Sequence, residues 1–203
     1  MGKAADLRLD EATHTYYVDG LPVPGVTRVI EPLADFDKVP REVLDRAAKR
    51  GTAVHLATQL DDEDDLDEDS LDPVLIPYLE AWRKFRREQD VQIEGVENRV
   101  YHQRHRYAGT YDRIGRILKQ SDELAVIDIK AVAKLFPHIG VQTAAYQAAL
   151  NSARKKADHV TRRYAVQLKP DGTYRLEEYS DEADLSVFLG LLQVHNWRQR
   201  HGK

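Results

Sequence analysis

Apolar residues in the middle of the chain follow a pattern that predicts three consecutive β-strands. The segment Leu124–Ile129 is a short apolar run rich in β-branched residues, which is typical of a mostly buried strand. A preceding strand is predicted from Tyr107 to Leu118, with the polar residues 119–123 forming the turn between the two. An earlier strand, Val91–Tyr101, would pair with it through a turn at residues 102–106.

Helices are predicted both before and after these strands in the sequence. Residues 73–89 repeat apolar side chains at helical spacing, which predicts an amphipathic helix whose aromatic residues belong to the core. The apolar positions are Leu75, Leu79, Trp82 and Phe85. After Gly140 another helix, rich in alanine, is predicted to end near Asn151 and to pack closely against the sheet.

The start of the chain is predicted to form a β-ribbon over residues 1–30. Segments 14–18 and 21–24 flank Asp19-Gly20, which is a strong hairpin signal. The small N-terminal hairpin is expected to be an appendage of the main domain.

A helix is predicted over residues 41–50, and a separate one after it. Gly51 is expected to break the first helix and Thr52 to cap the next, which covers residues 53–60. His55 would then lie on the first turn of that second helix.

The end of the chain is predicted to support the sheet. Strands are expected over residues 161–168 and 173–179, and the first of them would extend the sheet after a helical crossover. Ser180 or Asp181 would cap a final apolar-faced helix.

The composition is typical of one globular domain over residues 1–203. With 42% hydrophobic and 32% charged residues, a chain of 203 residues can bury a substantial core. No apolar run approaches the roughly 20 residues that span a bilayer, and residues 1–5 lack the apolar core of a signal peptide, so we expect a cytoplasmic protein. The absence of cysteine excludes disulfides, thiolate metal sites and an iron–sulfur cluster.

Charge is distributed unevenly along the chain. Residues 61–72 contain nine acidic residues and no basic one, so removing them from the net charge of −4 leaves the remainder at +5. We therefore expect an exposed, mobile acidic loop and a basic surface elsewhere. A solvated loop between two helices explains the acidic run. The alternatives are a DNA mimic that occludes a groove and an extra cation site.

Two aspartates and one lysine are the candidate catalytic residues. Residues two apart on a strand share a face, so Asp128 and Lys130 would project together while Ile129 turns into the core. Antiparallel pairing can set Asp112 beside Asp128, and the repulsion between two carboxylates must be offset. A divalent cation with oxygen ligands offsets it, and Lys130 could stabilise the developing charge of a phosphoryl transition state.

Together with Gly51, His55, Gly109, Gln142 and Tyr146, these residues resemble the sequence pattern of the PD-(D/E)XK nuclease superfamily, in particular its RecB-like and phage exonuclease branch. The matching residues are Gly51 and His55 in Gly-x-x-x-His, Gly109 and Asp112, Asp128-Ile129-Lys130, and Gln142 and Tyr146 in Gln-x-x-x-Tyr. Asp-x-Lys alone is a weak signal, but four pieces in this order are specific. The chain lacks the iron–sulfur cysteines found in other members of the branch.

The resemblance implies an α/β (α+β) fold with a restriction-endonuclease-like core, in which helices flank a central mixed sheet. The catalytic sheet and helix would span residues 91–168. The implied metal ligands for Mg²⁺ or Mn²⁺ are Asp112, Asp128, the backbone carbonyl of Ile129, and His55, whose imidazole would favour Mn²⁺ somewhat. The implied catalytic residues are Asp112, Asp128 and Lys130.

Further residues are candidates for contact with DNA or with the metal. As the resemblance implies, Gln142 and Tyr146 would position the nucleotide next to the scissile phosphate from one helix face. If the resemblance holds, Arg50 lies where a DNA backbone would pass, but compensation of the helix macrodipole is a sufficient explanation for its position. Arg28 could touch a phosphate, although a surface salt bridge explains Arg28 better. Glu97 is a candidate extra acid at the metal site, and a salt bridge to an arginine, Arg99 or Arg113, explains it equally well.

Together these features predict a divalent-metal-dependent nuclease that hydrolyses phosphodiester bonds in DNA. An exonuclease that acts on DNA ends is the first expectation. A structure-specific endonuclease is the alternative within the same chemistry, because end preference depends on loops that spacing does not reveal. A non-catalytic DNA-binding module is the rival of another class, and an ordinary α/β protein would require four coincidental matches. Polarity, strand preference, metal count, oligomeric state and a recombination or replication partner stay open. The expected setting is a bacterial or phage-infected cell.

Overall fold

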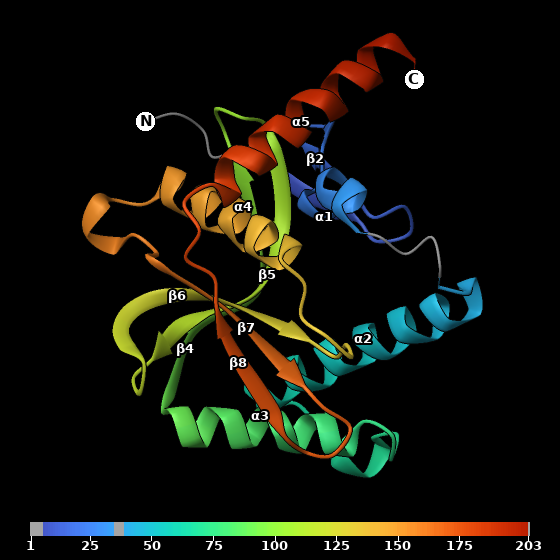
Figure 1. Ribbon diagram of the computed structural model, residues 1–203, viewed down its shortest axis with the longest axis vertical. Helices are drawn as coiled ribbons and strands as arrows, with labels where there is room; N and C mark the ends of the chain where they lie inside the picture. Colours follow the sequence, from blue (N-terminus) through green and yellow to red (C-terminus); the bar gives the residue numbers. More distant parts are fainter. Residues whose placement is uncertain (1–5, 35–38, 203) are drawn as a thin grey trace.

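A five-stranded mixed sheet forms the centre of the computed structural model, which describes residues 6–34 and 39–202 (Figure 1). The strands are β4 Val91–His102, β5 Tyr107–Ile117, β6 Ser121–Lys130, β7 Arg162–Leu168 and β8 Tyr174–Glu178, and they neighbour one another in this order. Neighbours are antiparallel except β6 and β7, which run parallel and are joined through helix α4, His138–Ala153. All five strands predicted for this region are confirmed, with small shifts at their ends.

Helices cover both faces of the sheet. Helices α4 and α5 (Asp184–His201) lie on one side, and α3 (Ile76–Gln89) lies on the other with the end of α2 (Arg41–Asp62) (Figure 1). Short helical segments are α1 Val26–Ile30, η1 Glu31–Leu33, η2 Glu68–Ser70 and η3 Lys156–Asp158. The predicted fold class, a central mixed sheet flanked by helices with a small N-terminal β-element, is confirmed. Within the described part of the chain, no helix has the length and apolar character needed to cross a membrane.

Strand β6 supplies apolar side chains to both layers. Leu124 and Val126 pack in the cluster with α4 and α5, whereas Ala125, Ile127 and Ile129 pack in the cluster with α3. Because helices cover both faces of the sheet, residues 124–127 of the strand form a continuous apolar run instead of an alternation.

The aromatic residues of α3 belong to the core, as predicted. Trp82 and Phe85 are completely buried, with their ring centroids 5.4 Å apart. The helix begins at Ile76, later than the predicted start at Pro73. Only this boundary needs correction.

The N-terminal β-element is a sheet of three antiparallel strands, β1 (Leu7–Asp10), β2 (Thr15–Val18) and β3 (Leu21–Val23). The predicted hairpin joins β2 and β3, and its turn residues Asp19 and Gly20 have positive φ angles of 50° and 81°. The hairpin prediction is incomplete because β1 adds a third strand, for which the alternation of apolar and charged residues was a signal. Residues 1–5 of the predicted ribbon, like Lys203, lie outside the described residues.

The predicted break at Gly51 is wrong, because α2 runs through it as one helix. Glycine in a helix interior costs only about 1 kcal/mol relative to alanine, which the rest of a long helix can offset. The hydroxyl of Thr52 donates to the carbonyl of Ala48 at 3.2 Å instead of capping a new helix. His55 therefore lies inside a long helix and not on a first turn.

The acidic segment 61–72 is not a uniformly exposed loop. Asp61 and Asp62 are the last residues of α2, and their side chains are only 10% and 1% exposed. The expected exposure is wrong for these two aspartates, because arginines from α3 and β5 pair with them in the interior. The acidic residues from Glu63 to Asp72 are exposed, as predicted.

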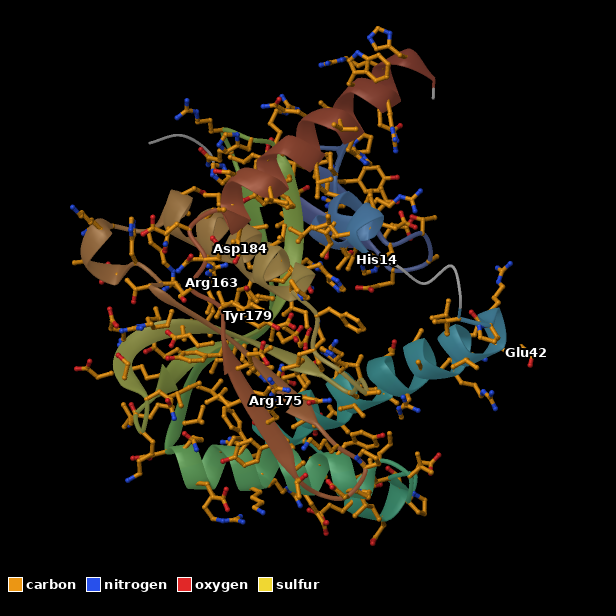
Figure 2. All side chains as sticks on the ribbon, viewed as in Figure 1. His14, Glu42, Arg163, Arg175, Tyr179 and Asp184 are labelled. Atoms are coloured by element: carbon orange, nitrogen blue, oxygen red, sulfur yellow. The ribbon has the colours of Figure 1, made fainter. Side chains whose placement is uncertain are left out.

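Helix α5 begins at Asp184, later than a cap at Ser180 or Asp181 predicts. The side chain of Asp181 accepts a hydrogen bond from the N–H of Ala183 at 2.8 Å, so it forms a turn ahead of the helix. Asp184 pairs with the buried Arg163 of β7 at 2.8 Å (Figure 2). This ion pair attaches the start of α5 to the sheet.

The register between β4 and β5 requires a glycine at position 115, beside a bulge between Ile93 and Gly95. A Cβ atom on Gly115 would lie 2.3 Å from the carbonyl oxygen of Gln92. We predict that Gly115→Ala lowers the free energy of unfolding by about 1–3 kcal/mol, measured by urea denaturation, because two backbones must move apart. In the control Gly51→Ala, the new Cβ meets nothing within 4 Å, so stability should rise by about 0.5–1 kcal/mol. Unchanged stability of Gly115→Ala would contradict this register.

Candidate metal centre

Three potential metal ligands converge where α2, β4 and β5 meet. Nδ1 of His55 lies 3.5 Å from Oε1 of Glu97 and 3.4 Å from Oδ1 of Asp112. One ligand atom from each of the three residues lies within 4.8 Å of the others. Octahedral ligands about 2.1 Å from Mg²⁺ are about 3.0 Å apart, so this spacing is close to that of a coordination sphere. The structure thus brings together two predicted ligands, His55 and Asp112, with the accessory acid Glu97.

The register of β5 and β6 places Asp112 beside Asp128. Arg113 faces Ile127 in the antiparallel pair, so the next position matches Asp112 with Asp128. At this point a side chain replaces the backbone ladder, because Oδ2 of Asp112 accepts the N–H of Ile129 at 2.6 Å. Asp112 therefore keeps one oxygen on the strand and leaves Oδ1 for the site. The carbonyl of Ile129 stays a predicted ligand.

Asp128 and Lys130 project together from the end of β6, and Ile129 between them is completely buried. Oδ2 of Asp128 lies 2.7 Å from Nζ of Lys130, in a close ion pair. The other oxygen, Oδ1, has no hydrogen-bond partner among the described residues, although the side chain is only 1% exposed. A buried carboxylate oxygen without a donor is costly, so Oδ1 fits a cation as its missing partner.

Burial and neighbouring charges shift the pKa values of Asp128, Asp112 and His55 in different directions. Burial raises the pKa of Asp128, Lys130 lowers it in part, and the result is about 6. Burial also raises the pKa of Asp112, but His55, Lys130 and a backbone N–H lower it to about 2. Burial lowers the pKa of His55, whereas Asp112 and Glu97 raise it to about 10. The carboxylates therefore attract positive charge, which a proton on His55 supplies.

Glu97 occupies a strained backbone position beside the site. Its φ of +44° lies in the left-handed region, which is uncommon for residues other than glycine. Its Oε1 lies 3.1 Å from Nη1 of Arg113, so the salt bridge that the sequence allowed is present, and the same oxygen faces His55. Strained backbone of this kind clusters at functional sites.

Arg113, completely buried on β5, connects the site to the helices beneath it. Its guanidinium donates to Oδ2 of Asp62 at 2.6 Å, Oγ1 of Thr58 at 3.2 Å, Oε1 of Glu97 at 3.1 Å and the backbone carbonyl of Asp112 at 2.7 Å. The sequence indicated only the salt bridge to Glu97 and not the burial of this residue, because arginine on a strand is usually exposed. Only the tertiary structure brings its partners together.

Gln142 and Tyr146 form a buried pair on α4. Nε2 of Gln142 donates to the hydroxyl of Tyr146 at 3.2 Å. The tyrosine ring packs on Gly109, where a Cβ atom would lie 2.6 Å from Cε1 of the ring. Gly109 therefore permits a close approach between β5 and α4, whereas contact of the pair with a nucleotide stays a prediction.

The two arginines proposed to contact phosphate lie on different helices. Arg28 on α1 pairs with Glu31 at 2.8 Å, which is the salt bridge that the sequence favoured. Arg50 lies within α2, ahead of His55, and its buried Nε has no hydrogen-bonding partner among the described residues. Contact with DNA stays a prediction for both.

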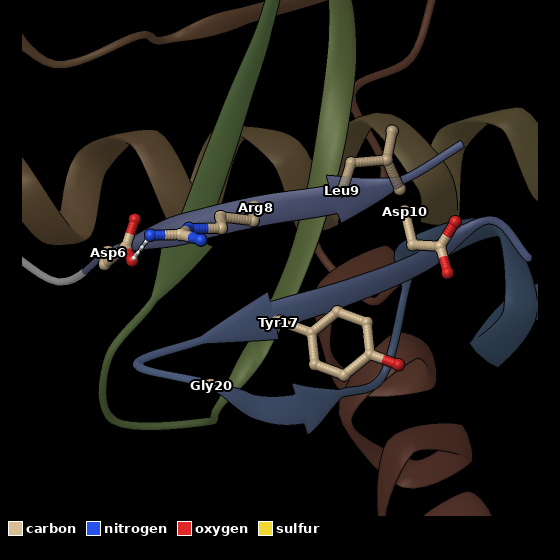
Figure 3. A pocket seen from close by; sticks show the side chains of 6 residues that line it. All are labelled: Asp6, Arg8, Leu9, Asp10, Tyr17 and Gly20. Atoms are coloured by element: carbon tan, nitrogen blue, oxygen red, sulfur yellow. Dashed lines mark ion pairs between the residues drawn. The ribbon is translucent and has the colours of Figure 1, made fainter. Parts of the chain in front are cut away.

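A hollow on the N-terminal sheet contains none of the predicted site residues. It measures about 400 Å³ and is lined by Asp6, Arg8, Leu9, Asp10, Tyr17 and Gly20 (Figure 3). Arg8 and Asp6 form an exposed ion pair there at 2.7 Å. We therefore assign the candidate chemistry to the carboxylates of the main sheet.

Comparison with known proteins finds similar solved structures only. No protein-family model and no curated protein matches the sequence. The structure of SSO0001 has a TM-score of 0.35 and 15% identity, over 83% of this chain and 81% of that one. The alkaline exonuclease LHK-Exo from Laribacter hongkongensis has a TM-score of 0.35 and 14% identity, over 88% and 92% of the two chains. Its complex with dAMP has a TM-score of 0.34 and 13% identity, over 89% and 93%.

We predict that Arg113→Met lowers the free energy of unfolding by about 3 kcal/mol or more in chemical denaturation, because it removes a partner of the buried Asp62. The control is Arg162→Met, whose ion pair with Glu123 joins side chains that are 40% and 42% exposed. That change should cost no more than about 1 kcal/mol. Equal losses in the two variants would show that the Arg113 network has no special role in stability.

Proposed function

We propose that this protein is a divalent-metal-dependent nuclease that hydrolyses phosphodiester bonds in DNA. The observation that carries the proposal is the buried carboxylate of Asp128, whose Oδ2 lies 2.7 Å from the ammonium group of Lys130 and whose Oδ1 has no hydrogen-bond partner among the described residues. Structural ion pairs inside proteins normally have their remaining oxygens satisfied. An unsatisfied carboxylate beside a lysine instead suits the binding of a cation and a phosphate.

The residues present fit a hard divalent cation. Asp112 turns Oδ1 towards the site, Glu97 and His55 lie close to it, and Asp128 occupies the facing position on β6. Carboxylate oxygens with one imidazole nitrogen suit Mn²⁺ and, with water, Mg²⁺. When bound, such an ion supplies a water of lowered pKa and neutralises phosphate oxygens.

Lys130 serves as a cation in this proposal and not as a base. Burial lowers its pKa, but the carboxylates of Asp128 and Asp112 raise the pKa above its ordinary value. The charged amine, 20% exposed, can donate to a phosphate oxygen and stabilise the charge that develops during hydrolysis. Asp128 keeps the amine in place, and Asp112 fixes the end of β6 through the N–H of Ile129.

DNA is the proposed substrate because the chain outside the acidic segment carries a net charge of +5. Arg50, whose Nε has no hydrogen-bond partner among the described residues, is the first candidate for a phosphate contact. Action on DNA ends is proposed first and structure-specific endonuclease activity second. A partner protein in recombination or replication and a cytoplasmic location are further parts of the proposal.

The set of metal ligands is testable by titrating the protein with Mn²⁺ in a calorimeter. We expect Asp112→Asn to weaken binding at least about tenfold, because an amide is a weaker ligand than a carboxylate. Glu97→Gln should weaken binding if the accessory acid is a ligand. The matched control is Glu94→Gln on the same strand, whose carboxylate is paired with Arg116 at 3.2 Å, and it should bind like wild type. Unchanged affinity in Asp112→Asn would remove this residue from the site.

Cleavage of end-labelled linear DNA and closed circular DNA, with Mg²⁺, Mn²⁺ or EDTA, tests the activity. We expect metal-dependent loss of linear DNA and at least about a 100-fold lower rate in Asp128→Asn. Asp122→Asn, an exposed position on the same strand, is the control and should keep the wild-type rate. Nicking of the circle would assign an endonuclease. DNA binding without cleavage under any condition would leave the non-catalytic module.

A further inference from the structure

The loop between β6 and α4 is firmly attached to the sheet. Leu135 is buried in a cluster with Ile139 and Ala165. Nε2 of Gln167 donates to the carbonyls of both Val132 and Ala133, at 2.8 and 2.9 Å. The loop therefore holds its outward side chains in fixed positions, directly after Lys130.

This anchored loop presents an aromatic pair to solvent. The rings of Phe136 and His138 are stacked, with centroids 5.7 Å apart and planes 8° apart. The ammonium group of Lys134 lies 5.8 Å from the centroid of the Phe136 ring. Although it is apolar, Phe136 remains 40% exposed. The loop thus offers a flat aromatic surface with a cation over the Phe136 ring.

The ring pair forms one wall of a pocket of about 350 Å³, whose other walls include Leu33, Val141 and Val187. Leu33 and Val187 are 36% and 42% exposed, so the lining is apolar and open. Burial lowers the pKa of His138, and the charge of Lys130 lowers it further. The carboxylate of Asp184, also at the pocket, is occupied by Arg163.

We propose that this pocket binds a nucleobase of the DNA strand by stacking it on the Phe136–His138 pair, while Lys134 contacts an adjacent phosphate. The inference rests on the proposed nuclease function and adds a base-binding subsite to it. An aromatic plane stacks on any base, so the subsite tolerates all sequences. Its place directly after Lys130 lets one strand occupy both the metal centre and the pocket.

The alternative is that the aromatic pair only covers the start of α4. Leu135 and the hydrogen bonds of Gln167 already anchor the loop, so the exposed ring of Phe136 is not needed for that purpose. The two explanations differ in one measurable respect. Stacking on a base depends on the presence of a base, whereas a structural role does not.

The test uses a labelled single-stranded oligothymidylate and an abasic oligomer of equal length, with binding followed by fluorescence anisotropy in EDTA. We expect Phe136→Ala to weaken binding of the oligothymidylate roughly 5- to 100-fold, which is the range for loss of one stacking side chain. Phe136→Trp should keep the wild-type affinity and show quenching of the introduced indole. Val74→Ala is the control, because it removes an equally apolar side chain that is 62% exposed elsewhere. It should bind like wild type.

The abasic oligomer separates stacking from indirect effects. Wild type should bind it more weakly than the oligothymidylate, and Phe136→Ala should weaken that binding no further. An equal loss with both oligomers, or no loss with either, would overturn the subsite. Cleavage by wild type, measured in parallel, separates the two proposals. If wild type cleaves DNA but Phe136→Ala has no effect on oligomer binding, only the subsite is contradicted. If wild type neither binds nor cleaves DNA, the nuclease function is contradicted as well.

Discussion

The arrangement of the site depends on the ion pairs and hydrogen bonds of the Arg113 guanidinium group. This group is completely buried and is neutralised by Asp62 at the end of α2, at 2.6 Å. Through the same group it binds Glu97 of β4 and the backbone of Asp112. A buried charge tolerates little displacement, since each lost partner leaves a desolvated ion. The helix that carries His55 and the two strands that carry the acids are therefore held in one geometry.

The second constraint is the pairing of β5 with β6. Antiparallel register matches Asp112 with Asp128, and the parallel pairing of β6 with β7 continues to Lys130. The strand thus remains supported beyond the point where β5 stops pairing with it. The side chain of Asp112 occupies the N–H of Ile129 that β5 no longer reaches. At this strand end the side chain of Lys130 is 20% exposed, whereas the carboxylate of Asp128 lies buried beside it.

Sequence patterns predicted the elements well where a local rule applied. The apolar run of β6, the Asp19-Gly20 turn and the spacing of Asp128 and Lys130 follow from the geometry of strands and turns. Sequence patterns failed where contacts between residues far apart in the sequence determine the structure. Gly51 stays inside a helix, and Asp62 is buried within an acidic run, because α3 and β5 supply the packing and the arginines. The role of Arg113 belongs to this second kind.

The carboxylates of the site favour nearby positive charge. Arg113 forms ion pairs with both Asp62 and Glu97, so it offsets Glu97 only in part. Lys130 offsets one of the three carboxylates, and protonation of His55 another, which is why the pKa of that imidazole rises to about 10. In the proposed metal centre, a metal ion and this proton would compete for the same excess of negative charge. As a ligand, His55 would have to release its proton, so the proposal implies a metal affinity that rises with pH.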